Sequence, residues 1–168
     1  MEFSNIEVLQ LPDISKITFK KIHKDYLKVV TLTILSIFSV LFLALFLLET
    51  NVEEIASFSY IMYMYFLVLL LFIILISAFI IGFSRRKYAL RDKDLTYKSG
   101  VLIKTITTVP FSRIQHVEIN EAPISRLFQL ASLNVFTAGD SSNDLVIKGI
   151  KKEEALKIKE FINQQIHG

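Results

Sequence analysis

The sequence predicts an α+β membrane protein: a two-helix transmembrane hairpin followed by a small antiparallel β partial barrel or sandwich with a C-terminal helix. Three observations support this fold class. Two long apolar runs without charge lie in the first half of the chain. Beyond residue 84 the apolar residues alternate, which is the period of a strand, and residues 152–166 return to the period of a helix.

The first apolar run covers residues 29–48, which are twenty residues without a charge. At about 1.5 Å of rise per residue, a helix of this length spans about 30 Å, the thickness of the hydrocarbon core of a bilayer. A cleaved signal peptide is the alternative. We reject it because the run is too long, begins too late and lacks a cleavage site of small residues.

The second apolar run ends at residue 83, and we assign the second span to residues 58–83. Tyr60, Tyr63 and Tyr65 near its start suit an aromatic belt at a membrane interface. The spans divide the chain into an N-terminal segment (1–28), a transmembrane hairpin (29–83) with a short loop (49–57), and a C-terminal domain (84–168).

Flanking charge predicts how the hairpin is oriented in the membrane. The loop 49–57 holds three glutamates and no base, whereas basic residues flank both spans on the other side. The membrane-flanking basic residues are Lys24, Lys28, Arg85, Arg86 and Lys87. The positive-inside rule therefore places both termini in the cytoplasm, in a multi-pass protein of the cell membrane. Attraction of these charges to anionic headgroups explains them without a specific lipid site.

A loop this short makes the two spans antiparallel neighbours. Both contain small residues, namely Ser36, Ser39, Ala44, Ser77, Ala78 and Gly82. These residues either allow the helices to pack closely or simply face lipid, and the sequence leaves both readings open. Neither span contains an Asp, Glu, Lys, Arg or His, which argues against a transporter.

The C-terminal domain reads as a series of short strands. We expect strands over residues 87–92, 95–98, 101–109, 113–119, 133–137 and 145–148, with a short helix from Pro123 to Phe128. Gly149 separates the last strand from an amphipathic helix over residues 152–166. This helix is expected to cover the sheet, because so small a domain needs its apolar stripe for a core. An interfacial membrane helix is the alternative.

Several classes of chemistry are disfavoured. The chain has no cysteine, and His23, His116 and His167 lie too far apart for the ligand spacing of a zinc site. No phosphate-binding loop, nucleophile elbow or metalloprotease motif is present. We therefore predict no catalytic residues, no metal and no cofactor. The basic residues do not cluster as nucleic-acid binding requires.

Two segments resemble a known family. They are VPFSRIQHVEI (109–119) and APISRLFQLASLNVFTAG (122–139), with SGVLIK (99–104) and LVIKGI (145–150) in similar style. They are similar to bacterial membrane proteins with a Pleckstrin-homology-like (PH-like) domain, of the short type with two transmembrane helices. The resemblance implies two nearly orthogonal antiparallel sheets with a C-terminal helix, in the bacterial inner membrane. It implies no established ligand.

One position departs from that family pattern. Gln129 stands where many members carry glycine after the Leu-Phe pair. Because glycine tolerates backbone angles that glutamine disfavours, the turn at this position is expected to differ.

Arg113 and Gln115 are candidate contacts for a partner or a lipid headgroup. They alternate along one predicted strand, so we expect both on one face. The competing interpretation is structural: either side chain could hold the Pro110 turn by bonding backbone carbonyls.

Arg126 is the third candidate contact, in the short helix after Pro123. Its planar guanidinium could bind a phosphate group, or it could pair with Glu121 or Asp140.

The function predicted first is a non-enzymatic, membrane-anchored PH-like module for protein assembly at the cytoplasmic face. Its partner would be a related multi-domain membrane protein or another copy of the chain. The alternative is a sensor or binder of anionic lipid headgroups. A membrane enzyme or transporter component ranks third. Residues 6–11 alternate enough to add a strand to a sheet edge.

Overall fold

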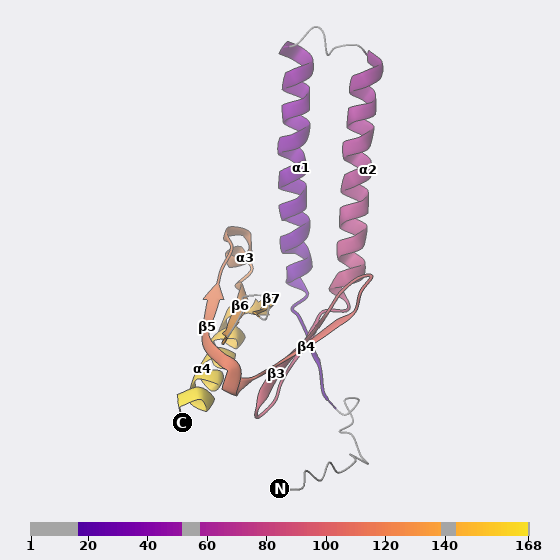
Figure 1. Ribbon diagram of the computed structural model, residues 1–168. Helices are drawn as coiled ribbons and strands as arrows, with labels where there is room; N and C mark the ends of the chain where they lie inside the picture. The colour runs from indigo at the N-terminus through magenta and orange to yellow at the C-terminus, as the bar shows by residue number, and fades with distance from the viewer. Residues whose placement is uncertain (1–16, 52–57, 139–143, 168) are drawn as a thin grey trace.

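The computed structural model describes residues 17–51, 58–138 and 144–167 (Figure 1). Two long helices, α1 (Asp25–Asn51) and α2 (Phe58–Phe83), stand side by side and project from a small β domain. Only 17% and 6% of the residues in their most apolar windows are buried, so these are not core helices of a soluble protein. Both are long and apolar enough to cross a membrane.

Helix α1 is longer than predicted, since it begins at Asp25 rather than at residue 29 and ends at Asn51 rather than at residue 48. Polar residues at both ends remain helical outside the apolar run. Helix α2 has the predicted bounds. Most of the predicted loop, and the alternating residues 6–11, lie outside the described residues.

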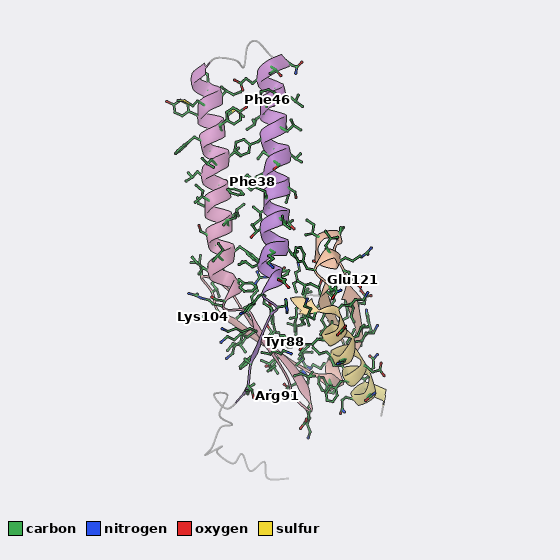
Figure 2. The ribbon with its side chains drawn as sticks, turned by 180° about the vertical axis from the view of Figure 1, so that it is seen from behind. Phe38, Phe46, Tyr88, Arg91, Lys104 and Glu121 are labelled. Carbon is green, nitrogen blue, oxygen red and sulfur yellow. The ribbon has the colours of Figure 1, made fainter. Side chains whose placement is uncertain are left out.

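Aromatic side chains pack the two helices together. The rings of Phe38 and Phe72 meet edge to face with centroids 5.0 Å apart, and those of Phe42 and Tyr65 stack at 5.8 Å. The Tyr65 hydroxyl donates a hydrogen bond of 3.0 Å to Glu49. Figure 2 shows Phe38 between the helices. The close-packing interpretation of the small residues is wrong for four of them, because Ser36, Ser39, Ala44 and Ser77 are exposed.

In the described part of the chain, seven strands form two antiparallel sheets. The first sheet has the order β1 (Lys20–Lys21), β2 (Lys87–Leu90), β3 (Asp94–Ser99), β4 (Thr105–Pro110). The second has the order β5 (Ile114–Asn120), β6 (Leu130–Thr137), β7 (Leu145–Lys151). The remaining elements are the 3-10 turn η2 (Phe111–Arg113), the short helix α3 (Pro123–Leu127) and the C-terminal helix α4 (Lys152–His167). The predicted α+β order is confirmed.

The helix hairpin is inserted between two neighbouring strands of one sheet. Strand β1 precedes α1 and pairs with β2, which follows α2, so that Lys20 lies opposite Tyr88. Both ends of the hairpin are therefore held by one ladder. The predicted boundary at residue 84 leaves out β1, and it also leaves out Ile22 and Tyr26, which are buried in the core of the β domain.

A second attachment joins the start of α1 to the other sheet. The backbone N–H of His23 donates to the carbonyl of Gly149 at 2.8 Å. Gly149 has φ +83°, and a Cβ there would lie 2.5 Å from Cγ of Tyr26. The prediction that Gly149 ends the last strand is wrong: β7 passes through it to Lys151, with a register shift opposite Ala131 and Ser132.

Helix α4 covers the second sheet, as Figure 1 shows. Its apolar stripe is buried with the sheet residues, so the alternative of an interfacial membrane helix is wrong. The largest fully buried side chains of the core are Leu95, Leu130, Leu133, Ile147, Ile150 and Ile162.

Strand β4 is shorter than the alternation of residues 101–109 predicts. Gly100 adopts φ +115° and turns the chain, so residues 100–104 form a loop and β4 begins at Thr105. We call residues 100–104 the β3–β4 loop. Alternation alone did not reveal this, because the loop residues Val101 and Ile103 are as apolar as strand residues.

Candidate functional site

Three lysines form a row across the first sheet. The register places Lys21 of β1 opposite Lys87 of β2, and Lys87 opposite Lys98 of β3. Residues directly opposite in an antiparallel ladder project from the same face, and like charges there destabilise a sheet. The row therefore places three positive charges side by side on one face of the sheet.

Two lysines of the row, Lys87 and Lys98, line a pocket of about 360 Å³ at the end of α2. We call it the basic pocket, and its lining residues are Ser84, Arg85, Lys87, Lys98, Ser99, Lys104, Thr105 and Ile106. Four of these residues are basic and none is acidic. An uncompensated set of cations in a hollow attracts anions more strongly than the same charges on a flat surface.

Neighbouring groups hold two of the four cations in place. The Arg85 guanidinium donates to the carbonyl of Val101 in the β3–β4 loop. The Lys98 ammonium lies 3.9 Å from the centroid of the Phe19 ring, in a cation–π contact. Lys104 is exposed, and Figure 2 shows it beside the end of α2 that joins the β domain. The pocket thus combines two cations held by neighbouring groups with the half-buried Lys87 and the exposed Lys104.

The pocket lies where a bilayer crossed by α2 would place its headgroups. Arg85 and Lys87 follow within four residues of Phe83, the last residue of α2. Lysine ammonium groups bind phosphate as point charges, whereas arginine can also bind it through two parallel hydrogen bonds. The arrangement can therefore hold a phosphate-bearing headgroup.

Arg113 and Gln115 do not form the predicted pair on one strand face. Arg113 is the last residue of η2, and Gln115 falls at an irregularity of β5, where the register shifts between Ile114 and His116. The predicted locking role is also not observed among the described residues, since the Phe111 N–H bonds the Lys93 carbonyl at the Pro110 turn. Both side chains are exposed, away from the basic pocket.

Arg126 lies exposed on α3, which Figure 1 places alongside the first turns of α1. The predicted pairing with Glu121 is wrong, because Lys152 binds that carboxylate at 2.8 Å. The other predicted partner, Asp140, lies outside the described residues. Arg126 is exposed and is not part of the basic pocket.

The five membrane-flanking bases divide into three groups. Arg85 and Lys87 belong to the basic pocket. Lys28 instead pairs with Asp25 at 3.0 Å, and Arg86 lies over the ring of Phe79 with 5.2 Å to its centroid. The fifth, Lys24, lines a separate hollow between the ends of the two helices.

Lys98 and Lys104 were missed as site residues by sequence reasoning. Lys98 lies in β3 just before the β3–β4 loop, and Lys104 is the last residue of that loop. The correct pairing of β2 with β3 would have placed both near Lys87. Within the described ranges, no group of three or more metal-ligating side chains is found. His116 stacks on Phe136, with ring centroids 4.3 Å apart, and is exposed.

Comparison with known proteins identifies relatives of this chain. It is 27% identical over 93 residues to the UPF0699 transmembrane protein YdbS of Bacillus subtilis, covering 54% of this chain and 57% of YdbS. It is 30% identical over 93 residues to the UPF0699 transmembrane protein YdbT of the same organism, covering 55% of this chain and 19% of YdbT. The chain therefore spans less than two thirds of either relative.

A crystal structure from Shewanella loihica, of a DUF1696 family protein with a pleckstrin-homology domain, is 22% identical with a TM-score of 0.39. The match covers 50% of this chain and 73% of that one. The names of the two Bacillus subtilis relatives indicate no enzyme activity. The family described as Bacterial PH domain matches residues 30–166, which include most of the hairpin and nearly all of the β domain that follows it. The chain is therefore a member of the bacterial PH domain family.

Proposed function

We propose that this protein is a non-enzymatic, membrane-anchored PH-like module that binds anionic lipid headgroups at the cytoplasmic face of the cell membrane. The observation that supports the proposal is the basic pocket at the end of α2, with four cations and no acid. The positive-inside rule supports the orientation, because Arg85 and Lys87 stand at the end of the span that faces this pocket.

Headgroup binding in this protein serves a purpose other than recruitment. Two apolar helices already hold the chain in the bilayer, and no surface contact adds meaningfully to such an anchor. A basic residue near an anionic leaflet contributes about 1 kcal/mol. Four such residues in one pocket are enough to enrich anionic lipid around the protein, so the pocket would select its lipid neighbours or respond to their composition.

Protein assembly is the second candidate function. It is favoured by one observation: the segment similar to this chain covers 19% of YdbT, so related sequence occurs within a much longer chain. A module that recurs in a longer membrane protein suits a role in assembly with such a protein or with another copy. The pocket itself, which is charged and hollow, suits a small anion better than a protein surface.

The test compares lipid retention by two double variants of the full chain. Lys98→Gln with Lys104→Gln removes two charges from the pocket, and Lys148→Gln with Lys157→Gln removes two exposed charges from β7 and α4. Each protein is purified from membranes in mild detergent, and its bound lipids are measured by native mass spectrometry. We expect the pocket variant to lose most of its bound phosphatidylglycerol and the control to keep it.

If both variants lost the same share of their bound phosphatidylglycerol, only net charge would matter. That result would count against the pocket. The same purification tests assembly. If a second protein co-purifies in stoichiometric amount with the natural chain but not with the pocket variant, that protein would replace lipid as the favoured ligand. If the chain purifies without a partner and with bound anionic lipid, the result would support the proposal.

A further inference from the structure

The tip of the β3–β4 loop exposes two consecutive large apolar side chains. Leu102 is 96% exposed and Ile103 is 81% exposed. Leu127 on α3 is similarly exposed, at 80%, but it stands without an equally exposed apolar neighbour in sequence, and others such as Leu156 at 49% are partly covered. Two adjacent side chains with almost no protein contact are unfavourable in water, which indicates a surface that is covered in the working protein.

The loop is fastened to the last turn of α2. Gly82 is buried against Val101, and a Cβ on Gly82 would lie 2.6 Å from Cγ2 of that side chain. The Arg85 side chain bonds the Val101 carbonyl. The conformation of the loop is set by Gly100, where a Cβ would lie 1.7 Å from the carbonyl oxygen of Ile103. The tip is thus held beside the transmembrane helix.

The apolar tip continues the lipid-facing surface of α2. Ile80 and Ile81, in the last turns of that helix, are about half exposed. Figure 1 shows the β3–β4 hairpin reaching up to the end of α2 where these residues lie. A bilayer that covers Ile80 and Ile81 therefore extends to the level of the loop tip.

We propose that Leu102 and Ile103 insert into the cytoplasmic leaflet, at the boundary between headgroups and acyl chains beside α2. The flanking residues match this depth, because Lys98 and Lys104 stand at either end of the loop and line the basic pocket. The tip would lie among acyl chains while the lysines remain at the level of the phosphates. The inference rests on the membrane crossing in the proposed function, but it does not require headgroup binding.

The absence of cysteine allows a direct measurement of depth. A single cysteine replaces Leu102 in the full chain, which is spin-labelled and reconstituted in vesicles of phosphatidylcholine alone. Leu67→Cys, exposed in the middle of α2, is the control for lipid, and Leu156→Cys on α4 is the control for water. Each label is tested for relaxation by oxygen, which concentrates in lipid, and by a water-soluble nickel chelate.

The quantity compared is the ratio of oxygen access to nickel access at each label. We expect this ratio at position 102 to be close to that at position 67 and at least several-fold greater than that at position 156. A ratio equal to that at position 156 would overturn the inference. Protection from both reagents would also overturn it, because a protein would then cover the tip. Neutral vesicles separate the two proposals: insertion of the tip persists there, whereas selection of anionic headgroups cannot be observed.

Discussion

The hydroxyl of Tyr88 in β2 donates a hydrogen bond of 2.5 Å to a carboxylate oxygen of Glu154 in α4. The same oxygen accepts a hydrogen bond of 2.6 Å from the ammonium of Lys20 in β1. One carboxylate thus joins the strand before the helix hairpin, the strand after it and the C-terminal helix. This bond network holds the β domain together at the point where the hairpin is inserted.

Replacing Tyr88 with phenylalanine is expected to destabilise the protein by about 1–2 kcal/mol, because a partly buried carboxylate loses one of its two donors. Thermal unfolding of the full chain in detergent, followed by circular dichroism, measures the loss. Tyr97→Phe is the matched control, since Tyr97 is also buried and its hydroxyl bonds no described residue. Equal losses for the two variants would contradict the role of the bond.

The stability of the protein is expected to fall in mild acid through Glu154. Burial alone would raise the pKa of this carboxyl, but the hydrogen bonds from Lys20 and Tyr88 and the charge of Lys20 outweigh it and lower the pKa below its ordinary 4.5. Burial raises the pKa of Tyr88, so its hydroxyl remains a donor. A carboxyl with a lowered pKa contributes stability above its unfolded pKa and loses that contribution as pH falls through the folded one.

The test is the unfolding midpoint between about pH 3 and pH 6 for the natural chain and for Glu154→Gln. We expect the natural chain to lose stability below about pH 4.5, and the variant, already weaker at neutral pH, to lose less over that range. Parallel curves would show that other acids dominate this transition.

Gln129→Gly is expected to stabilise the protein by about 0.5–1 kcal/mol. Gln129 has φ +55°, in the left-handed region where a side chain costs about 1–2 kcal/mol. The greater freedom of glycine in the unfolded chain offsets part of this gain. The midpoint of thermal unfolding measures it, and Gln129→Ala, which keeps the strained backbone, should give no increase. A destabilised glycine variant would mean that the glutamine side chain itself is needed.

Gly149→Ala is expected to destabilise the protein by about 2 kcal/mol or more, because the methyl group would overlap the Tyr26 ring and the backbone has φ +83°. Adding Tyr26→Ala should recover part of this loss by making room for the methyl group. A double-mutant cycle on unfolding midpoints measures the coupling. Strictly additive losses would show that the backbone angle alone matters.

Much of the fold could be predicted because its signals are local. Twenty residues without charge from Val29 predict a membrane-spanning helix, and the stripe of Ala155, Ile158 and Ile162 favours packing against a core. These features depend on the period and identity of neighbouring residues, which the sequence displays directly. The turn at Gln129 is different: it was expected to depart from a glycine turn, yet Gln129 adopts φ +55°, an angle that glycine favours.

The candidate site and the joining of hairpin to domain depend instead on which distant residues meet. No local pattern shows that Lys21 lies beside Lys87, because a strand of two residues has no readable period and its partner is more than sixty residues away. Gly82 was predicted to be a small residue of helix–helix packing, but in the structure it lies against Val101 of the β3–β4 loop. The sequence by itself therefore determined the spans, the order of elements and the C-terminal helix. Only the tertiary structure decided the basic pocket and the place of the loop, because register and long-range packing are set by the balance of the whole core.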